Sequence, residues 1–243
     1  MITFTFNGIN SSTMGVIVEK QPPLATPYNR YSFFNIRGYD GTISHYAGKN
    51  THQESFTILV VGLENFDKVR AWLYGDGRFT RSDLPDRYRN VSFIQQTAYN
   101  YVTSDDGGIW RAEITLDVLD PFWYSTREVT KADLENASFQ VDNRGNVPST
   151  PIVRIWSHSS VGNRTVTVQS EFLSFTYTHQ PGEQLILIDV DKGRAYLESL
   201  DGKRRDRFLE MEYKNQRIEP GTTSMSVRGD KSNIRLLNVD KWQ

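Results

Sequence analysis

Apolar and polar residues alternate along much of the chain with a period of two, which is the period of a half-buried β-strand. Runs of strand length occur at 2–6, 15–18, 56–61, 90–94, 99–102 and 109–118. Asn7-Gly8 follows the first run, and Asp- and Gly-rich residues at 104–108 precede the last; both tolerate positive φ and predict tight turns. The first half of the chain is therefore predicted to form a β-sandwich-like domain.

One segment has the period of a helix instead. Between residues 64 and 74, apolar side chains recur on one face at helical spacing. The residues on this face are Phe66, Val69 and Leu73. Gly75 is placed to end the helix, and a tight Asp-Gly turn is expected at 76–77, with residues 82–88 packing that turn. A single amphipathic helix is thus predicted to cover the sheet.

Residues 21–55 follow neither pattern. Prolines at the start restrict the backbone to extended conformations, and an aromatic- and glycine-rich stretch follows without core alternation. A long excursion of this kind in a compact domain is usually functional or held by a partner. We predict a projecting hairpin or arm that a partner holds in place. Its candidate interface residues are Tyr28, Tyr31, Phe33, Phe34, Arg37, Tyr39 and Tyr46.

A second domain is predicted from residue 136 to residue 243, after a first domain at 1–135. Polar residues at 129–136 indicate a linker between the two. Short strand-like runs then recur at 138–141, 151–156, 164–168, 174–177, 184–188, 194–197, 223–227 and 233–237, separated by Gly- and Pro-containing turns. Many short strands with such turns and no helical segment are typical of a β-sandwich or jelly roll.

Composition narrows the function. The 243 residues are 37% apolar and 12% aromatic, which supports buried cores. A formal net charge of -1 gives no general attraction to nucleic acid or to an anionic membrane, and neither is predicted as a partner. The chain has no cysteine, so disulfides and thiolate chemistry are excluded. Neither a secretory signal nor an apolar membrane-spanning window is evident.

No motif in the sequence demands catalysis. The four histidines lack the spacing of a zinc site within one element. Asp189 and Asp191 fit a hairpin turn better than a calcium loop. A hydrolase that uses a carboxylate pair stays open as an alternative. The acids available to it are Asp83, Asp86, Glu113 and Asp117. We predict no enzyme activity, no cofactor, and no catalytic, cofactor-binding or metal-binding residue.

Several motifs together resemble one family. VRAWL at 69–73, followed by Gly75 and SDLPDRY at 82–88, is similar to a signature of the distal tail (Dit) proteins of long-tailed siphophages. There, a short helix that ends in Trp-Leu precedes a Ser-Asp-x-Pro-Asp-x-Tyr element. Further motifs occur in the same order as in that family: DPFWY at 120–124, DNRGN at 142–146 with Pro148 and Pro151, LID at 187–189 and IEPG at 218–221.

The resemblance implies a structural role. It implies an N-terminal domain that assembles into a hexameric ring and a C-terminal galectin-like β-sandwich. In that family, the ring is the hub of the tail tip of a phage or prophage, assembled in the bacterial host cytoplasm. It joins the tail tube to the tail-associated lysin, fibre or receptor-binding proteins. A carbohydrate-binding sandwich that contacts the host surface is the alternative function.

Overall fold

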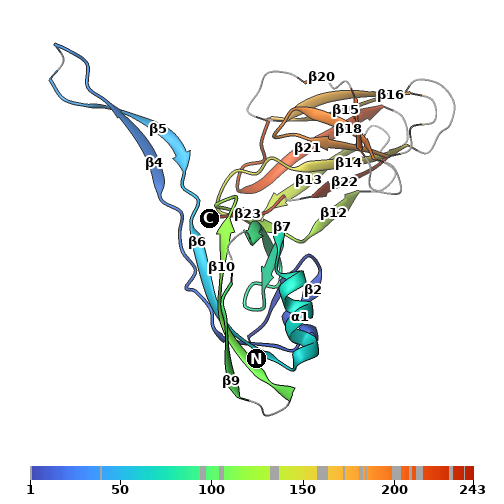
Figure 1. Ribbon diagram of the computed structural model, residues 1–243. Coiled ribbons are helices and arrows are strands. Elements are labelled where there is room, and N and C mark those ends of the chain that lie inside the picture. Colours follow the sequence, from blue (N-terminus) through green and yellow to red (C-terminus); the bar gives the residue numbers. More distant parts are fainter. Residues whose placement is uncertain are drawn as a thin grey trace. The chain divides into compact units, whose positions relative to one another are not determined.

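Strands dominate the computed structural model, as the alternation predicts (Figure 1). The described residues are 2–38, 40–93, 97–103, 107–131, 137–157, 164–171, 173–180, 183, 185–198, 204–207, 210–211, 216–229, 232–237 and 239–243. Within these ranges there is one α-helix, α1 (Leu63–Trp72). No described helix combines the length and apolarity needed to cross a membrane. The predicted mainly β fold is confirmed.

The chain folds into two compact units. One comprises Met1–Trp123 together with Gln243, and the other comprises Tyr124–Trp242. The boundary that the sequence predicts after residue 135 falls in the segment 132–136, outside the described residues. That boundary therefore stays a prediction.

The first unit contains a large antiparallel sheet. Its strands are β1 (Phe4–Phe6), β2 (Ile9–Asn10), β3 (Val16–Lys20), β6 (Gln53–Val61), β7 (Gly75–Arg81), β8 (Arg87–Phe93), β9 (Tyr99–Thr103) and β10 (Ile109–Val118). They follow the order β2-β1-β7-β8-β10-β6-β3, and β9 pairs with β10. A 3-10 helix at Ser11–Met14 links β2 to β3. The predicted pairing of the segments at 99–102 and 109–118 is confirmed.

The sheet curls around an aromatic core. The Phe4 ring of β1 lies 5.8 Å from the Phe56 ring of β6, although three strands lie between β1 and β6 in the sheet order. Phe56 also meets Phe79 of β7 at 5.3 Å, edge to face. These rings are almost fully buried. Their burial stabilises the unit, because each large aromatic removes much apolar surface from water.

Helix α1 packs on this core, close to its predicted position at 64–74. Gly62 precedes it with a φ of 88°, a value that favours glycine. Val69 is fully buried, and the Trp72 indole N–H donates to the backbone oxygen of Phe6 at 3.1 Å. The helix ends at Trp72, three residues before Gly75. Gly75 begins β7 instead, with a φ of 76°.

The expected Asp-Gly turn at 76–77 is wrong, because both residues lie inside β7. Gly77 pairs with Val91 of β8. A Cβ atom on Gly77 would stand 2.4 Å from the Phe6 ring and 2.2 Å from the side chain of Asn7. The glycine is needed for close packing within the sheet. Residues 82–88 therefore do not pack a turn at 76–77.

The second unit is a sandwich of two antiparallel sheets. The first sheet has the order β12-β22-β14-β17-β18-β19, and the second has the order β13-β21-β15-β16-β20. The strands are β12 (Glu128–Lys131), β13 (Ala137–Asn143), β14 (Ile152–Ser157), β15 (Arg164–Ser170), β16 (Ser174–His179), β17 (Leu185–Asp189), β18 (Arg194–Glu198), β19 (Arg204–Arg207), β20 (Glu210–Met211), β21 (Gly221–Gly229) and β22 (Ser232–Leu237). Two short strands, β11 (Trp123–Ser125) and β23 (Lys241–Trp242), pair with each other.

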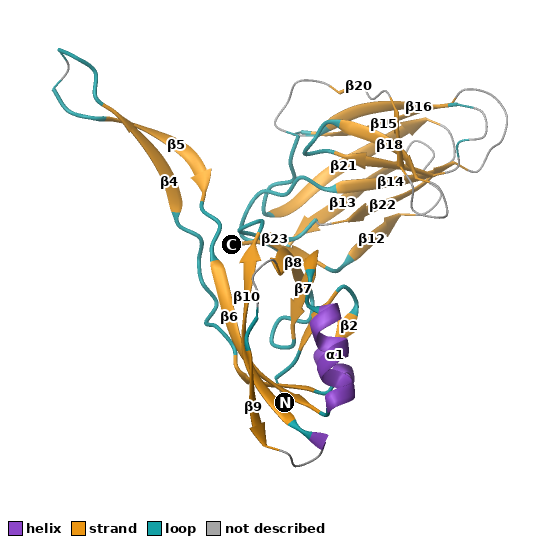
Figure 2. Cartoon of the chain, viewed as in Figure 1, coloured by secondary structure: helices purple, strands orange, loops and turns teal. Residues whose placement is uncertain are grey.

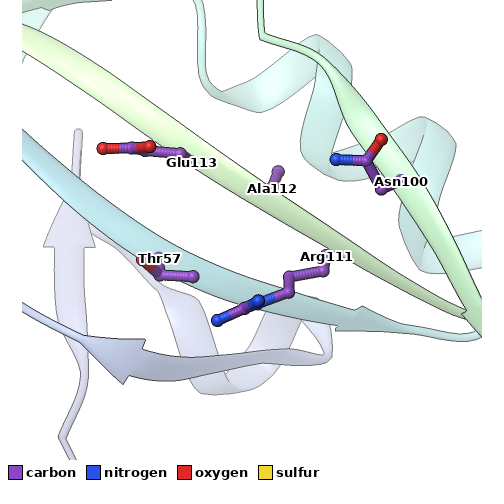
Figure 3. A pocket seen from close by; sticks show the side chains of 5 residues that line it. All are labelled: Thr57, Asn100, Arg111, Ala112 and Glu113. Carbon is purple, nitrogen blue, oxygen red and sulfur yellow. The ribbon is translucent and has the colours of Figure 1, made fainter.

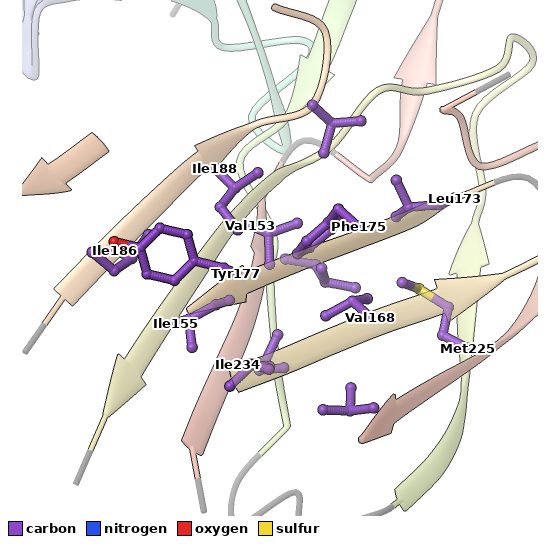
Figure 4. Close-up of a cluster of buried hydrophobic side chains, with 14 of the residues drawn as sticks. Val153, Ile155, Val168, Leu173, Phe175, Tyr177, Ile186, Ile188, Met225 and Ile234 are labelled. Carbon is purple, nitrogen blue, oxygen red and sulfur yellow. The ribbon is translucent and has the colours of Figure 1, made fainter. Parts of the chain in front are cut away.

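Apolar side chains from both sheets fill the space between them (Figure 4). The buried residues labelled there are Val153, Ile155, Val168, Leu173, Phe175, Tyr177, Ile186, Ile188, Met225 and Ile234. The sandwich predicted for this half of the chain is confirmed. One part of the expected linker is different: β12 pairs with β22, and Val129 packs against this core.

Candidate oligomer interface

The predicted arm contains a two-stranded ribbon of β4 (Asn29–Phe34) and β5 (Ile43–Lys49), shown in Figure 2. Among the described strands, these two pair only with each other. Phe34 pairs with Ile43 and Tyr31 with Tyr46, with a bulge between Asn29 and Tyr31. Gly38 has a φ of 83° in the connection between the strands. The ribbon leads through a short connection into β6.

Both faces of this ribbon are exposed. Tyr31 lies beside Tyr46 on one face, with ring centres 5.8 Å apart, and Phe33 lies on that same face with 68% of its surface exposed. Phe34 and Ile43 are exposed on the opposite face. An isolated two-stranded hairpin is at best marginally stable in water. Exposed aromatic side chains on both faces therefore indicate a contact that another molecule completes.

The entry to the arm is fixed by a charged pair. Arg81, at the end of β7, is almost fully buried, and its guanidinium binds both carboxylate oxygens of Asp83 at 2.9 and 2.8 Å. The same guanidinium donates to the backbone oxygen of Pro22 at 3.0 Å, and Gln21 donates to Asp83 at 3.4 Å. Hydrogen bonds from Arg81 hold the pKa of Asp83 below its usual value. Residues 21–22 are thus tied to the sheet.

The arm's base is closed by backbone and side-chain hydrogen bonds. The Asn50 backbone N–H donates to the backbone oxygen of Tyr28 at 3.0 Å, and the Asn50 side chain also donates to the Tyr28 hydroxyl. Two residues later, the backbone oxygen of His52 accepts a hydrogen bond from Val118 of β10 at 2.9 Å. Both ends of the arm are therefore fixed.

A buried charged cluster lies where the end of the arm joins the sheet. Glu54 and Arg89 are both buried and form an ion pair, and His52 Nε2 lies 3.0 Å from Glu54 Oε1. The Arg89 guanidinium stacks over the Trp123 ring at 3.8 Å. Burial lowers the pKa of Arg89, and the neighbouring Glu54 carboxylate opposes that effect. The buried ion pair thus links β6 to β8, which are not neighbours in the sheet.

Several solved structures have the same architecture as this chain. No family model and no curated protein matches the sequence. Dit of phage SPP1, described as a paradigm of the hub adsorption apparatus in phages that infect Gram-positive bacteria, aligns with a TM-score of 0.65 at 18% identity over 100% of both chains. The baseplate of phage P2 in its activated conformation with Ca aligns at 0.61 and 10% identity, over 100% of this chain and 98% of that chain. The same baseplate with Sr aligns at 0.55 and 11% identity, over 98% of each chain.

The chain has the fold of a Dit protein. The resemblance that the motifs indicate is thus confirmed for the fold and extends over the whole chain.

On this Dit fold, the predicted interface residues separate into three groups. Tyr31, Phe33, Phe34 and Tyr46 lie in the ribbon, where Tyr31 meets both Phe33 and Tyr46. Tyr28 is exposed at the arm's base, and Arg37 is exposed in the connection between the strands. Tyr39 lies outside the described residues. Whether these residues form an interface stays a prediction.

The contacts that anchor the arm cannot be predicted from the sequence pattern. Arg81 and Pro22 are 59 residues apart, and Glu54 and Arg89 are 35 apart. No local periodicity reports such contacts. One signal is present: the pattern Arg-x-Asp at 81–83 lies at a strand end of the Dit-like motif, where a buried arginine needs a carboxylate. This motif holds the entry of the arm.

Other candidate chemistry is not assembled in the described part of the chain. No group of three His, Cys, Asp or Glu residues there could hold a metal ion. Asp83 is engaged by Arg81, and Asp117 accepts from Gln53 at 2.7 Å. A shallow depression of about 230 Å³ contains Glu113, as Figure 3 shows. Its full lining is Thr57, Asn100, Arg111, Ala112 and Glu113.

The second unit offers a half-buried tryptophan on the outer face of its larger sheet. The guanidinium of Arg235 lies over the Trp156 ring, 4.6 Å from its centre. Sugar-binding sites stack a sugar ring on an aromatic face, and here the arginine occupies a face of that ring. Asp189 and Lys192 form an ion pair within a hairpin turn, as the turn interpretation predicts.

Proposed function

We propose that the protein is the structural hub of a siphophage or prophage tail tip. The observation that carries this proposal is the fold shared with SPP1 Dit over the full length of both chains. That relative is described as the hub of an adsorption apparatus, and the other matches are baseplate structures. A fold shared over both units supports a shared use of the two units.

The ring is held by the arm. A closed ring needs a heterologous interface, in which one patch of a subunit fits a different patch on the next. The exposed ribbon supplies the first patch, because aromatic residues contribute most binding free energy in the centre of interfaces. Its fixed base orients it, so that little conformational freedom is lost on assembly. We propose six copies per ring.

The hub connects other tail components and needs no chemistry of its own. We propose that one side of the ring contacts the tail tube and that the other side contacts the tail-associated lysin, fibre or receptor-binding proteins. The protein then resides at the virion tail tip after assembly in the host cytoplasm. Its function lies in shape and rigidity.

Mass measurement tests the ring directly. Native mass spectrometry of the purified protein over a concentration series should show a species of six times 28.0 kDa. Electron micrographs of that species should show rings with sixfold symmetry. A mass that stays at one chain at the highest soluble concentration, with no rings in the micrographs, contradicts the proposal.

A further inference from the structure

Three edge strands of the first unit's sheet differ in how well they are protected from pairing with another chain. Within the described residues, β2, β3 and β9 each pair on one side only. β2 has two residues, which is too short to accept a strand. β3 carries Glu19 and Lys20, and its pairing is interrupted by a bulge. Charges, bulges and short length are the features that keep an edge from pairing with other chains.

β9 differs from β3 in charge, although its pairing with β10 also has a bulge, between Ile109 and Trp110. Its sequence, YNYVT, contains no charged residue and no proline. One large apolar side chain is exposed on each face of the strand: Tyr101 is 59% exposed on one face, and Val102 is 55% exposed on the other. Tyr101 also continues an aromatic row, because its ring meets Trp110 at 5.6 Å and Trp110 stacks on Phe66. A strand that pairs along this edge could place apolar side chains beside Tyr101 on one face and Val102 on the other.

Strand β4 of the arm has the complementary properties. It is six residues long, against five in β9, and its residues 31–34 are uncharged. It carries aromatic side chains on both faces, and within the described residues one of its edges is unpaired. A strand added beside β9 therefore gains apolar neighbours on each face and backbone hydrogen bonds along the edge.

Charge favours the same pairing. Residues 21–50 contain three basic residues, Arg30, Arg37 and Lys49, against the single acidic residue Asp40. The depression beside β9 contains both Arg111 and Glu113 (Figure 3). Arg111 forms an ion pair with Glu19, whereas no described cation forms an ion pair with Glu113. An arm with excess positive charge is attracted to an uncharged edge that has a free carboxylate beside it.

We propose that β4 of one copy pairs with the free edge of β9 in the adjacent copy, so that an intermolecular sheet closes the ring. This assignment rests on the proposed hub function and names the second patch of its heterologous interface. The arm would thus complete the sheet of the next copy, and β9 would be covered only in the assembly.

The test places one charge on each of two edges. Val102→Lys on β9 is compared with Ile17→Lys on β3, because both replace an exposed β-branched side chain on an edge strand. A buried lysine beside a cationic arm should raise the dissociation constant of the assembly at least about tenfold for Val102→Lys. The Ile17→Lys variant should assemble like the unmodified chain. Analytical ultracentrifugation measures both, and thermal unfolding checks that each variant is folded.

Cysteine pairs locate the contact. The natural chain has no cysteine, so introduced thiols can link only with one another. Ser32→Cys is combined in turn with Asn100→Cys, Tyr101→Cys and Val102→Cys, which covers both faces of β9. Under oxidation, at least one pair should give a ladder of reducible oligomers, and Ser32→Cys with Ile17→Cys should not.

The outcomes separate the two proposals. If the unmodified chain forms rings but Val102→Lys assembles equally well, the β9 assignment is wrong and the hub function stands. Equal loss in Val102→Lys and Ile17→Lys, or rings without any β9 cross-link, also overturns the assignment. If the unmodified chain never assembles, both proposals fail.

Discussion

Two groups of aromatic residues in the first unit have opposite surroundings. In the core, Phe4, Phe56 and Phe79 contact one another, and Phe56 is 1% exposed. In the arm, Tyr31 and Phe33 contact only ribbon residues among the aromatic pairs of the described chain, and both are exposed. The chemical composition is similar. The difference lies in whether the same chain supplies the partner.

The sequence pattern reflects this difference. Core aromatics alternate with polar residues, as in Phe4-Thr5-Phe6, because one face of the strand meets the core. In the arm, Phe33 and Phe34 are adjacent and point to opposite faces. A strand with large apolar residues on both faces has no solvent face. This pattern supports the proposal that a second copy covers the arm.

The largest expected effect is a difference in the free energy of unfolding between core and arm variants. Phe56→Ala should lower the free energy of unfolding by about 3–5 kcal/mol, because it leaves a cavity in a closely packed core. Phe33→Ala should change it by less than about 0.5 kcal/mol, because the side chain is already exposed. Denaturant unfolding of the monomer measures both. Similar losses for the two variants would contradict the conclusion that only the core aromatics stabilise the monomer.

An intermediate effect is expected on assembly. Phe33→Ser should weaken self-association by about tenfold to thirtyfold, as truncation of an aromatic interface residue commonly does. Ile9→Ser is the matched control, since Ile9 is an exposed apolar residue outside the arm. Sedimentation over a concentration series gives both constants. If Ile9→Ser weakens assembly as much as Phe33→Ser does, general surface apolarity is the cause and the arm has no special part.

The smallest effect concerns the anchor of the arm. The pKa of Asp83 is lowered in the folded protein, chiefly by the hydrogen bonds from Arg81, from an ordinary value of 3.8. The carboxylate therefore stabilises the fold above that ordinary value, and this contribution is lost as the pH falls through the lowered pKa. Since the Asp83 side chain is 39% exposed, solvent screening limits its contribution to at most about 1 kcal/mol.

Asp83→Asn tests this anchor. The variant should unfold more easily than the natural chain near neutral pH, and the difference should disappear at a pH below the lowered pKa of Asp83. Urea unfolding across this range measures it, together with protease cleavage at residues 21–24. A stability difference that does not depend on pH would show that the carboxylate charge is not what holds the arm's entry.

The sequence predicts those parts of the fold whose apolar residues recur with the period of a strand or a helix. Alternation gives the strands of both units, and helical spacing gives α1, because each burial pattern repeats within a few residues. Gly77 is different: its requirement comes from Phe6 and Asn7, which are distant in sequence. The polar residues at 129–136 predict a linker, yet 129–131 belong to β12; the pairing of β12 with β22 is not visible in its own composition.

The candidate interface divides in the same way. The sequence predicts the arm, because its missing alternation and its glycines are local features. It does not predict the anchors, because Arg81 with Pro22 and Glu54 with Arg89 meet only after the sheet has formed. The free edge of β9 is a property of sheet order, and no single segment of sequence contains it.

Hydrogen exchange measures directly whether a second copy covers the arm in the assembly. Exchange at the backbone amides of residues 29–34 and 43–49 would be compared between dilute monomer and assembled protein. We expect rapid exchange of the arm in the monomer and strong slowing in the assembly, while the core strand β6 exchanges slowly in both. Equal exchange of the arm in monomer and ring would contradict the claim that this ribbon holds one copy to the next.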